Sequence, residues 1–130
     1  MSSRRDFIKK SAIIGTGIAM SPSLSFGAND PYKDKKLNVG LIGVGLRGTN
    51  HLNNVLLRDD VNVTAICDID PRRIKIALDR IDKAGAKKPK VFGKNDLDYR
   101  NLLELKEVDA VIISTPWLWH TRMAKDSMLA

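Results

Sequence analysis

The chain has 130 residues, 43% of them hydrophobic and 28% charged, and a formal net charge of +7. This composition excludes disordered and fibrous proteins, and the length suits one domain with a core better than a two-domain enzyme. Residues 1–27 hold four basic residues and one acidic residue, so they supply nearly half of the net charge. The lysines at positions 87, 88 and 90 form the one dense basic cluster elsewhere, and we interpret it as a solvated loop. We therefore predict no nucleic-acid binding.

The order of residues 1–27 is that of an export signal. A basic segment precedes a weakly apolar stretch at residues 11–20, and small and polar residues follow. The segment Ser3–Lys9, SRRDFIK, resembles the twin-arginine pattern S-R-R-x-F-L-K, with Ile in place of Leu. The competing interpretation is a basic amphipathic N-terminal helix. Cleavage after Gly27 would leave small residues at the required positions, and cleavage after Ala28 is the alternative.

The apolar stretch of this signal is too short to serve as a membrane anchor. It contains two glycines and falls well short of the roughly 20 apolar residues that a bilayer-spanning helix needs. We therefore predict export to the periplasm by the twin-arginine route, without a stable membrane anchor.

A β-α-β unit follows an exposed lead-in at residues 28–36. The apolar, β-branched run 37–42 predicts a buried strand, and residues 47–58 place apolar side chains at helical spacing. Residues 61–67 predict a second strand of the same kind.

The rest of the chain repeats this alternation of strand and helix. Asp70 is followed by a proline, a pair typical of a helix N-cap and first turn. A short strand at 91–92, a helix at 98–106, a strand at 108–113 and a last helix at 121–130 come next. This alternation predicts an α/β fold, a doubly wound parallel sheet of the Rossmann type, over residues 37–130.

Three glycines in the pattern G-x-G-x-x-G directly follow the first predicted strand and open the first helix. Gly43 permits a tight turn, Gly45 lets the backbone approach a diphosphate, and Gly48 allows close packing of helix on strand. Asp68 ends the next strand 20 residues after Gly48, which is the arrangement of the dinucleotide-binding fingerprint. The competing interpretation is a Rossmann-like domain that binds no nucleotide.

The residue type at position 68 bears on the choice of dinucleotide. Asp68 is placed to accept hydrogen bonds from the adenosine ribose and to repel a 2′-phosphate, which favours NAD over NADP. Arg72 and Arg73 complicate this prediction, because arginines just beyond the strand could accommodate that phosphate. We favour NAD because Asp68 occupies the selecting position itself.

The segment after the last predicted strand, Thr115 to His120, is expected to face the same crevice as the glycine turn. It contains Trp117, Trp119 and His120, an unusual concentration of aromatic side chains. They are candidates for cofactor contact. In the competing interpretation the tryptophans pack the sheet edge and the histidine caps the last helix.

Four segments together resemble the glucose-fructose oxidoreductase / inositol dehydrogenase (Gfo/Idh/MocA) superfamily. They are LNVGLIGVGLRGTNH, AICDIDP, DYRNLL and VDAVIISTPWLWHT. GVGLRG and TPWLWH most resemble its NAD-dependent glycosidases, glycosyl hydrolase family 109, typified by α-N-acetylgalactosaminidase. The resemblance covers residues 37–130 and implies bound NAD. It implies contacts to the diphosphate from Leu46 and Arg47, to the ribose from Asp68, and to the nicotinamide half from Trp117, Leu118, Trp119 and His120.

Members of that family continue into an α+β substrate domain that carries the acid and base residues. This sequence ends at Ala130, so we expect a truncated Rossmann domain whose catalytic residues lie beyond residue 130, and we predict no metal site. Cys67, the single cysteine, lies in an apolar run and predicts a buried, inert thiol. The sequence is compatible with a homo-oligomer but does not predict the oligomeric state.

The resemblance implies a carbohydrate substrate and a redox-assisted reaction. NAD would oxidise the sugar at C3, the C2 proton and the group at C1 would be eliminated, water would add, and the retained NADH would reduce C3 again. Two alternatives are an NAD-dependent sugar or inositol dehydrogenase and a non-catalytic nucleotide-binding module.

Overall fold

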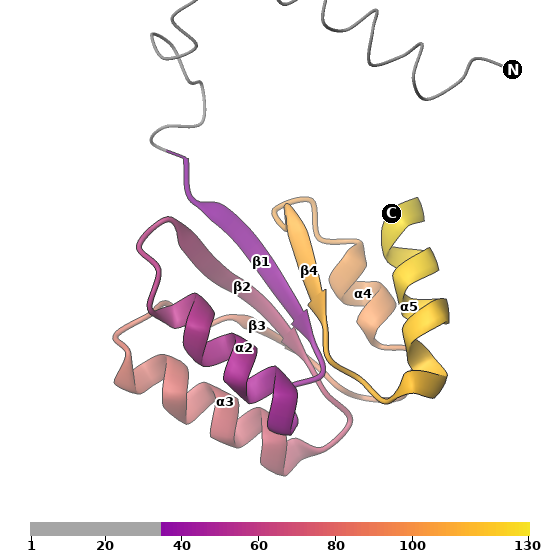
Figure 1. Ribbon diagram of the computed structural model, residues 1–130, viewed down its shortest axis with the longest axis horizontal. Helices are drawn as coiled ribbons and strands as arrows, with labels where there is room; N and C mark the ends of the chain where they lie inside the picture. Colours follow the sequence, from indigo (N-terminus) through magenta and orange to yellow (C-terminus); the bar gives the residue numbers. More distant parts are fainter. Residues whose placement is uncertain (1–34) are drawn as a thin grey trace, which may run out of the picture. The chain divides into compact units, whose positions relative to one another are not determined.

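The computed structural model describes residues 35–130. The predicted export signal at 1–27 and nearly all of the lead-in at 28–36 lie outside these residues. The described part is a parallel four-stranded sheet with helices on both faces, which confirms the predicted fold class (Figure 1). Its strands are β1 (Leu37–Ile42), β2 (Val61–Cys67), β3 (Lys90–Phe92) and β4 (Ala110–Ile113).

The strand order is β3-β2-β1-β4. The chain therefore winds outward in one direction from β1 to β3 and then returns to the other side of β1 for β4. In open α/β sheets a ligand crevice forms at the carboxyl ends of the strands where the order reverses. That position here lies between the ends of β1 and β4.

Two hydrophobic clusters lie on opposite faces of the sheet. One joins β1 and β2 to the helices α2 (Leu46–Leu56) and α3 (Pro71–Lys83) and includes the fully buried Leu41, Leu52 and Ile81. The other joins the sheet to α4 (Tyr99–Leu103) and α5 (Trp117–Leu129) and is centred on Tyr99, Leu102 and Met123. The apolar faces that the helical spacing predicts are the faces that pack here.

Two helix beginnings illustrate how local sequence sets the elements. The Asp70 carboxylate caps α3 as predicted, because its Oδ1 accepts a hydrogen bond from the Arg72 backbone N–H at 2.9 Å. The predicted start of the last helix at Thr121 is wrong. Helix α5 begins at Trp117, directly after Pro116, whose φ of −57° already suits a helix and whose carbonyl accepts from the Trp119 N–H at 2.9 Å.

Other boundaries shift by a few residues. Helix α2 begins at Leu46, one residue early, while α4 covers only Tyr99–Leu103 of the predicted 98–106. Beyond Leu103 the chain turns through bonds from Leu105 N to Leu102 O and from Val108 N to Leu105 O, so β4 starts at Ala110.

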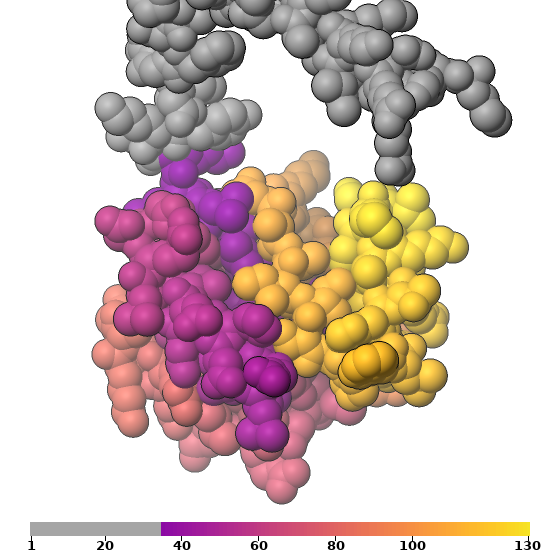
Figure 2. All heavy atoms as spheres, in the orientation of Figure 1, coloured from indigo at the N-terminus to yellow at the C-terminus, as the bar shows by residue number. Residues whose placement is uncertain are grey.

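In the space-filling view, residues of β4, in orange, remain visible between α2 and α5 (Figure 2). This agrees with the partial exposure of the whole strand. Within residues 35–130, no helix combines the length and the apolar character needed to cross a membrane.

Candidate cofactor site

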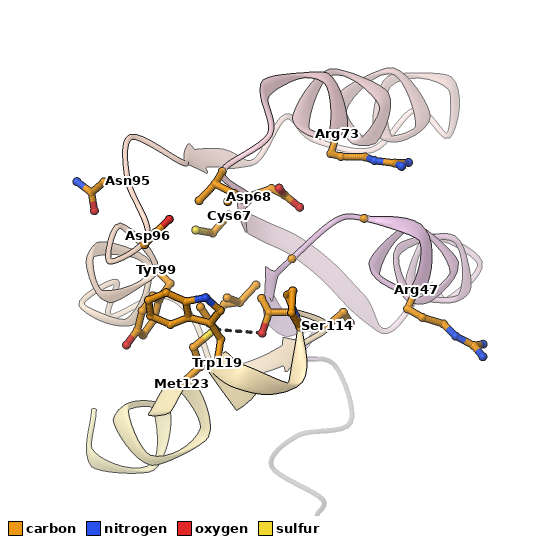
Figure 3. A pocket seen from close by; sticks show the side chains of 16 residues that line it. Arg47, Cys67, Asp68, Arg73, Asn95, Asp96, Tyr99, Ser114, Trp119 and Met123 are labelled. Carbon is orange, nitrogen blue, oxygen red and sulfur yellow. Dashed lines mark hydrogen bonds between the residues drawn. The ribbon is translucent and has the colours of Figure 1, made fainter. Parts of the chain in front are cut away.

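A pocket of about 400 Å³ opens at the carboxyl ends of β1, β2 and β4, where the reversal of strand order predicts a ligand crevice (Figure 3). Its walls come from the glycine turn, the β2–α3 turn, the β3–α4 turn and the beginning of α5. The residues that line it are Ile42, Gly43, Gly45, Arg47, Cys67, Asp68, Ile69, Arg73, Asn95, Asp96, Tyr99, Ser114, Thr115, Pro116, Trp119 and Met123.

Two of the three fingerprint glycines are required by the packing of the turn itself. Gly43 has a φ of +89°, and a Cβ there would lie 2.8 Å from the Ser114 carbonyl oxygen. A Cβ on Gly48 would lie 2.0 Å from the Gly43 carbonyl oxygen, closer than any real contact. The turn can therefore bring β1, α2 and the end of β4 together only without side chains at these positions.

Gly45 is different, because a Cβ at this position would have no atom within 4 Å. Its backbone, with φ −65° and ψ −154°, is extended and lies outside the left-handed region that favours glycine. The empty space is therefore on the ligand side of the turn, where a Cβ would occupy volume that a bound group needs.

Helix α2 begins at this turn with its N-terminus open to the pocket. No side chain caps it and its first turn holds no acidic residue. The first N–H groups of a helix have no intrahelical acceptor, and the helix dipole adds partial positive charge. Arg47, in the first turn of α2, lines the pocket. These groups fit the diphosphate of a dinucleotide.

The Asp68 carboxylate connects two of the turns that form the pocket. Its Oδ2 accepts from the Val44 N–H at 2.8 Å, and its Oδ1 accepts from the Asp70 N–H at 2.9 Å. Each carboxylate oxygen can accept a further hydrogen bond. Asp68 can therefore hold the glycine turn against the start of α3 and still accept from a ribose hydroxyl.

The wall formed by the β3–α4 turn depends on Asp98, which is 3% exposed. Its Oδ2 accepts from the Gly93 N–H at 2.6 Å and the Lys94 N–H at 2.8 Å. The hydrogen bonds from the Lys94 N–H, from the Asn101 side chain and from the Gly93 N–H, in that order, lower the pKa of Asp98 and keep it ionised. The folded turn presents Asn95 and Asp96 to the pocket. The sequence did not predict either residue, because the polar residues Lys94–Asp96 indicate a turn but not its contacts.

The remaining wall is apolar and comes from Tyr99, Met123 and the half-buried Trp119. The Tyr99 hydroxyl donates to Asp126 Oδ2 at 2.6 Å, and this bond is the main reason that the pKa of Asp126 is lowered. The Thr115 hydroxyl lies 3.2 Å from the Met123 sulfur. An apolar wall opposite a polar turn suits a ligand with a flat ring at one end and charge at the other.

The sequence-predicted residues divide into two groups. Gly43, Gly45, Arg47, Asp68, Thr115 and Trp119 line one pocket. Gly48 instead packs beneath the turn, and Leu46 is 76% exposed. Trp117 and Leu118 are 91% and 87% exposed, and His120 is also exposed.

The helical start at Trp117 explains this division. Successive side chains on a helix point about 100° apart, so Trp119 can turn inward only if Trp117 and Leu118 turn outward. The structure does not bring Leu46, Trp117, Leu118 or His120 into the pocket, and their contact with a cofactor stays a prediction.

Cys67 lies at the floor of the pocket and is buried, as predicted. Burial raises the pKa of its thiol to about 12, with smaller contributions from Asp98 and Asp68. The thiol is therefore neutral and unreactive at ordinary pH. Within residues 35–130 no group of three or more histidine, cysteine or acidic side chains is placed to hold a metal ion.

Comparisons with known proteins agree with this geometry. Residues 37–130 match the model of the Gfo/Idh/MocA oxidoreductase family, described as an NAD-binding Rossmann fold. A glycosyl hydrolase family 109 protein of Stenotrophomonas maltophilia is 38% identical over 98% of the chain and 27% of its own length. The α-N-acetylgalactosaminidase of Shewanella oneidensis is 37% identical over 96% of the chain and 31% of its own length. The chain thus spans less than a third of the length of these relatives.

The fold also recurs in solved structures. The myo-inositol dehydrogenase of Lactobacillus casei, in complex with NAD(H) and myo-inositol, superposes with a TM-score of 0.62 at 23% identity, over 73% of this chain and 26% of that one. The scyllo-inositol dehydrogenase of the same organism, with bound NAD(H) and scyllo-inositol, gives 0.60 at 21% identity over the same shares. At this identity the likeness concerns the fold.

Proposed function

The chain belongs to the Gfo/Idh/MocA oxidoreductase family, and we propose that its NAD-binding Rossmann domain serves an exported glycosidase that hydrolyses N-acetylgalactosaminide-like bonds. The observation that carries this proposal is the identity of 37–38% to glycosidases of family 109 over nearly the whole chain. The matched part is 27–31% of the length of those relatives, and in this proposal the substrate domain lies outside the matched residues.

The residues of the pocket have distinct tasks in this proposal. The N-terminus of α2 and Arg47 bind the diphosphate, while Asp68 accepts from the adenosine ribose. The apolar wall of Tyr99, Trp119 and Met123 excludes water from the ring that it covers.

Bound NAD would supply reversible hydride acceptance, which would permit transient oxidation of a sugar at C3, elimination of the C2 proton and the group at C1, addition of water, and re-reduction of C3 by the same cofactor. Such a cycle makes tight retention of the cofactor more useful than exchange. An exported enzyme has no cytosolic cofactor pool to draw on, so the proposed export through residues 1–27 is consistent with retention.

A second candidate is an NAD-dependent sugar or inositol dehydrogenase. The inositol dehydrogenases among the solved structures favour it, although at 23% identity or less they support the fold alone. The third, a non-catalytic nucleotide-binding module, predicts NAD binding without turnover.

The test uses the protein that carries this domain together with its substrate domain. With an aryl α-N-acetylgalactosaminide, the glycosidase releases the phenol with no net NADH, and a Gly45→Val variant is inactive. Accumulation of NADH on free sugar or inositol, with no phenol release, would refute the glycosidase and support the dehydrogenase. Binding of NAD with neither activity would support the non-catalytic module.

The proposed export is tested separately. Replacing Arg4 and Arg5 by lysine should keep the protein in the cytoplasm of a bacterium with a working twin-arginine system. Unchanged delivery of this double variant to the periplasm would contradict the twin-arginine route.

A further inference from the structure

Two neighbouring arginines in the first turn of α3 have different surroundings. Arg72 is engaged by the helix cap: its Nη2 lies 2.9 Å from Asp70 Oδ2, its Nε lies 3.1 Å from Asp70 Oδ1, and its side chain is 86% exposed. This pairing is the main reason that the pKa of Asp70 is lowered. The charge of Arg72 is therefore directed at the cap and away from the pocket.

Arg73 lines the pocket and is partly buried. Its side chain makes no hydrogen bond or ion pair with any residue of 35–130; only its backbone N–H is bonded, to the Asp70 carbonyl at 3.0 Å. The charge of Arg73 also lowers the pKa of the Asp70 carboxyl, but it is the smallest of the contributions that do so. Figure 3 shows Asp68 and Arg73 extending from the β2–α3 region toward the space beside α2. The pocket thus holds, beside the ribose-selecting carboxylate, a guanidinium that is unpaired among the described residues 35–130.

The negative charge of Asp68 is moderated by its own contacts. Both of its oxygens already accept hydrogen bonds from backbone N–H groups, those of Val44 and Asp70. Such bonds disperse carboxylate charge and reduce its repulsion of a nearby anion. An acidic residue held in this way excludes a 2′-phosphate less strongly than one that faces the ligand alone.

A guanidinium presents a planar set of donors that matches the oxygens of a phosphate. In dinucleotide-binding domains an arginine close to the end of the second strand is placed to accommodate a 2′-phosphate. We propose that Arg73, and not Arg72, is a specificity-determining residue that allows the pocket to bind NADP(H) in addition to NAD(H). This inference rests on the NAD-binding domain and does not depend on the glycosidase proposal.

The experiment compares two matched variants in the 130-residue chain. NADH and NADPH are titrated separately against wild type, Arg73→Gln and Arg72→Gln, with energy transfer from tryptophan to the reduced nicotinamide as the signal. Arg73→Gln should weaken NADPH binding roughly tenfold, the effect of losing a hydrogen bond to a charged group, and should change NADH binding less than about threefold. Arg72→Gln should leave the ratio of the two affinities unchanged.

Two further measurements separate a specific role from a structural one. NADPH binding by wild type should weaken more steeply with salt than NADH binding, and Arg73→Gln should remove that difference. Arg73→Lys, which keeps the charge, should restore part of the NADPH affinity. The proposal would be overturned if Arg73→Gln weakened the binding of NADH and NADPH equally. It would also be overturned if Arg72→Gln shifted the ratio of the two affinities as much as Arg73→Gln does. Wild type that binds NADH but not NADPH would also overturn it, whereas loss of binding to both would refute the cofactor site itself.

Discussion

The two ends of the cofactor pocket are built in different ways. At the β1–α2 end the backbone sets the shape, because Cβ atoms at Gly43 and Gly48 would collide with the carbonyl groups of Ser114, just after β4, and of Gly43. At the β4–α5 end side chains set the shape, and Trp119 contributes while Trp117, two residues earlier, is 91% exposed. The shape of a site that glycines create can be predicted from their positions in the sequence. The shape of a site that side chains create also depends on which way the helix that carries them is turned.

The largest expected effect of a single change lies at the backbone end. Gly48→Ala would place a Cβ 2.0 Å from the Gly43 carbonyl oxygen, which is backbone and cannot turn aside. Helix α2 would have to move away from β1, at an expected cost of about 3 kcal/mol in the free energy of unfolding, the upper end of the usual range for overpacking. Urea unfolding followed by circular dichroism measures this cost. A variant as stable as wild type would show that the turn is not packed as described.

A pair of tryptophan variants examines the other end. Trp119 packs against the cluster of Tyr99, Leu102 and Met123, so Trp119→Ala should cost about 2–3 kcal/mol of stability. Trp117→Ala, its matched control, should cost less than about 0.5 kcal/mol because the ring is 91% exposed. The same unfolding assay applies to both. Equal costs would contradict the helical phase that turns Trp119 inward.

The Asp68 carboxylate provides a test of how the backbone end is held in place. Asp68→Asn leaves one side-chain oxygen for two backbone N–H groups, those of Val44 and Asp70. We expect a loss of about 1–2 kcal/mol in stability without any ligand, together with weaker NADH binding. If Asp68 acted on the ribose alone, NADH binding would fall while the stability of the ligand-free chain stayed the same.

The smallest effect concerns Cys67, between the two ends. Burial raises its pKa to about 12 from the ordinary value of 9.0, which applies in the unfolded chain, so the folded state favours the protonated thiol. This contribution is complete below pH 9 and is lost as the pH rises from about 9 toward 12. At pH 10 wild type should lose about 1 kcal/mol more than Cys67→Ala, each relative to its own stability at pH 8. Parallel losses in the two proteins would contradict this pKa.

The sequence predicted those parts of the fold and the site that follow local rules. The strands, the Asp70 cap and the glycine turn depend on residues next to one another, and all three are present. The start of α5 was missed because Pro116 and the aromatic residues after it fit a loop as well as a helix.

Long-range contacts account for the rest of what the sequence did not predict. The bond from the Val44 N–H to Asp68 joins residues 24 apart in the chain. The position of Asn95 and Asp96 in the pocket wall depends on the hydrogen bonds that the buried Asp98 carboxylate accepts from the backbone N–H groups of its turn. Neither contact leaves a periodic or compositional pattern, although the residue types themselves are typical of turns.

The claim that this pocket holds NAD through the glycine turn is tested most directly at Gly45. A Cβ there meets no protein atom within 4 Å, so the main cost of Gly45→Val is the loss of a favourable N-cap residue of α2, about 1 kcal/mol in the free energy of unfolding. The valine side chain would fill the space where the diphosphate approaches the backbone. Titration of NADH should therefore show a loss of affinity of at least about a hundredfold, or roughly 2.7 kcal/mol. A stable Gly45→Val variant that binds NADH as tightly as wild type would contradict the assignment of the pocket.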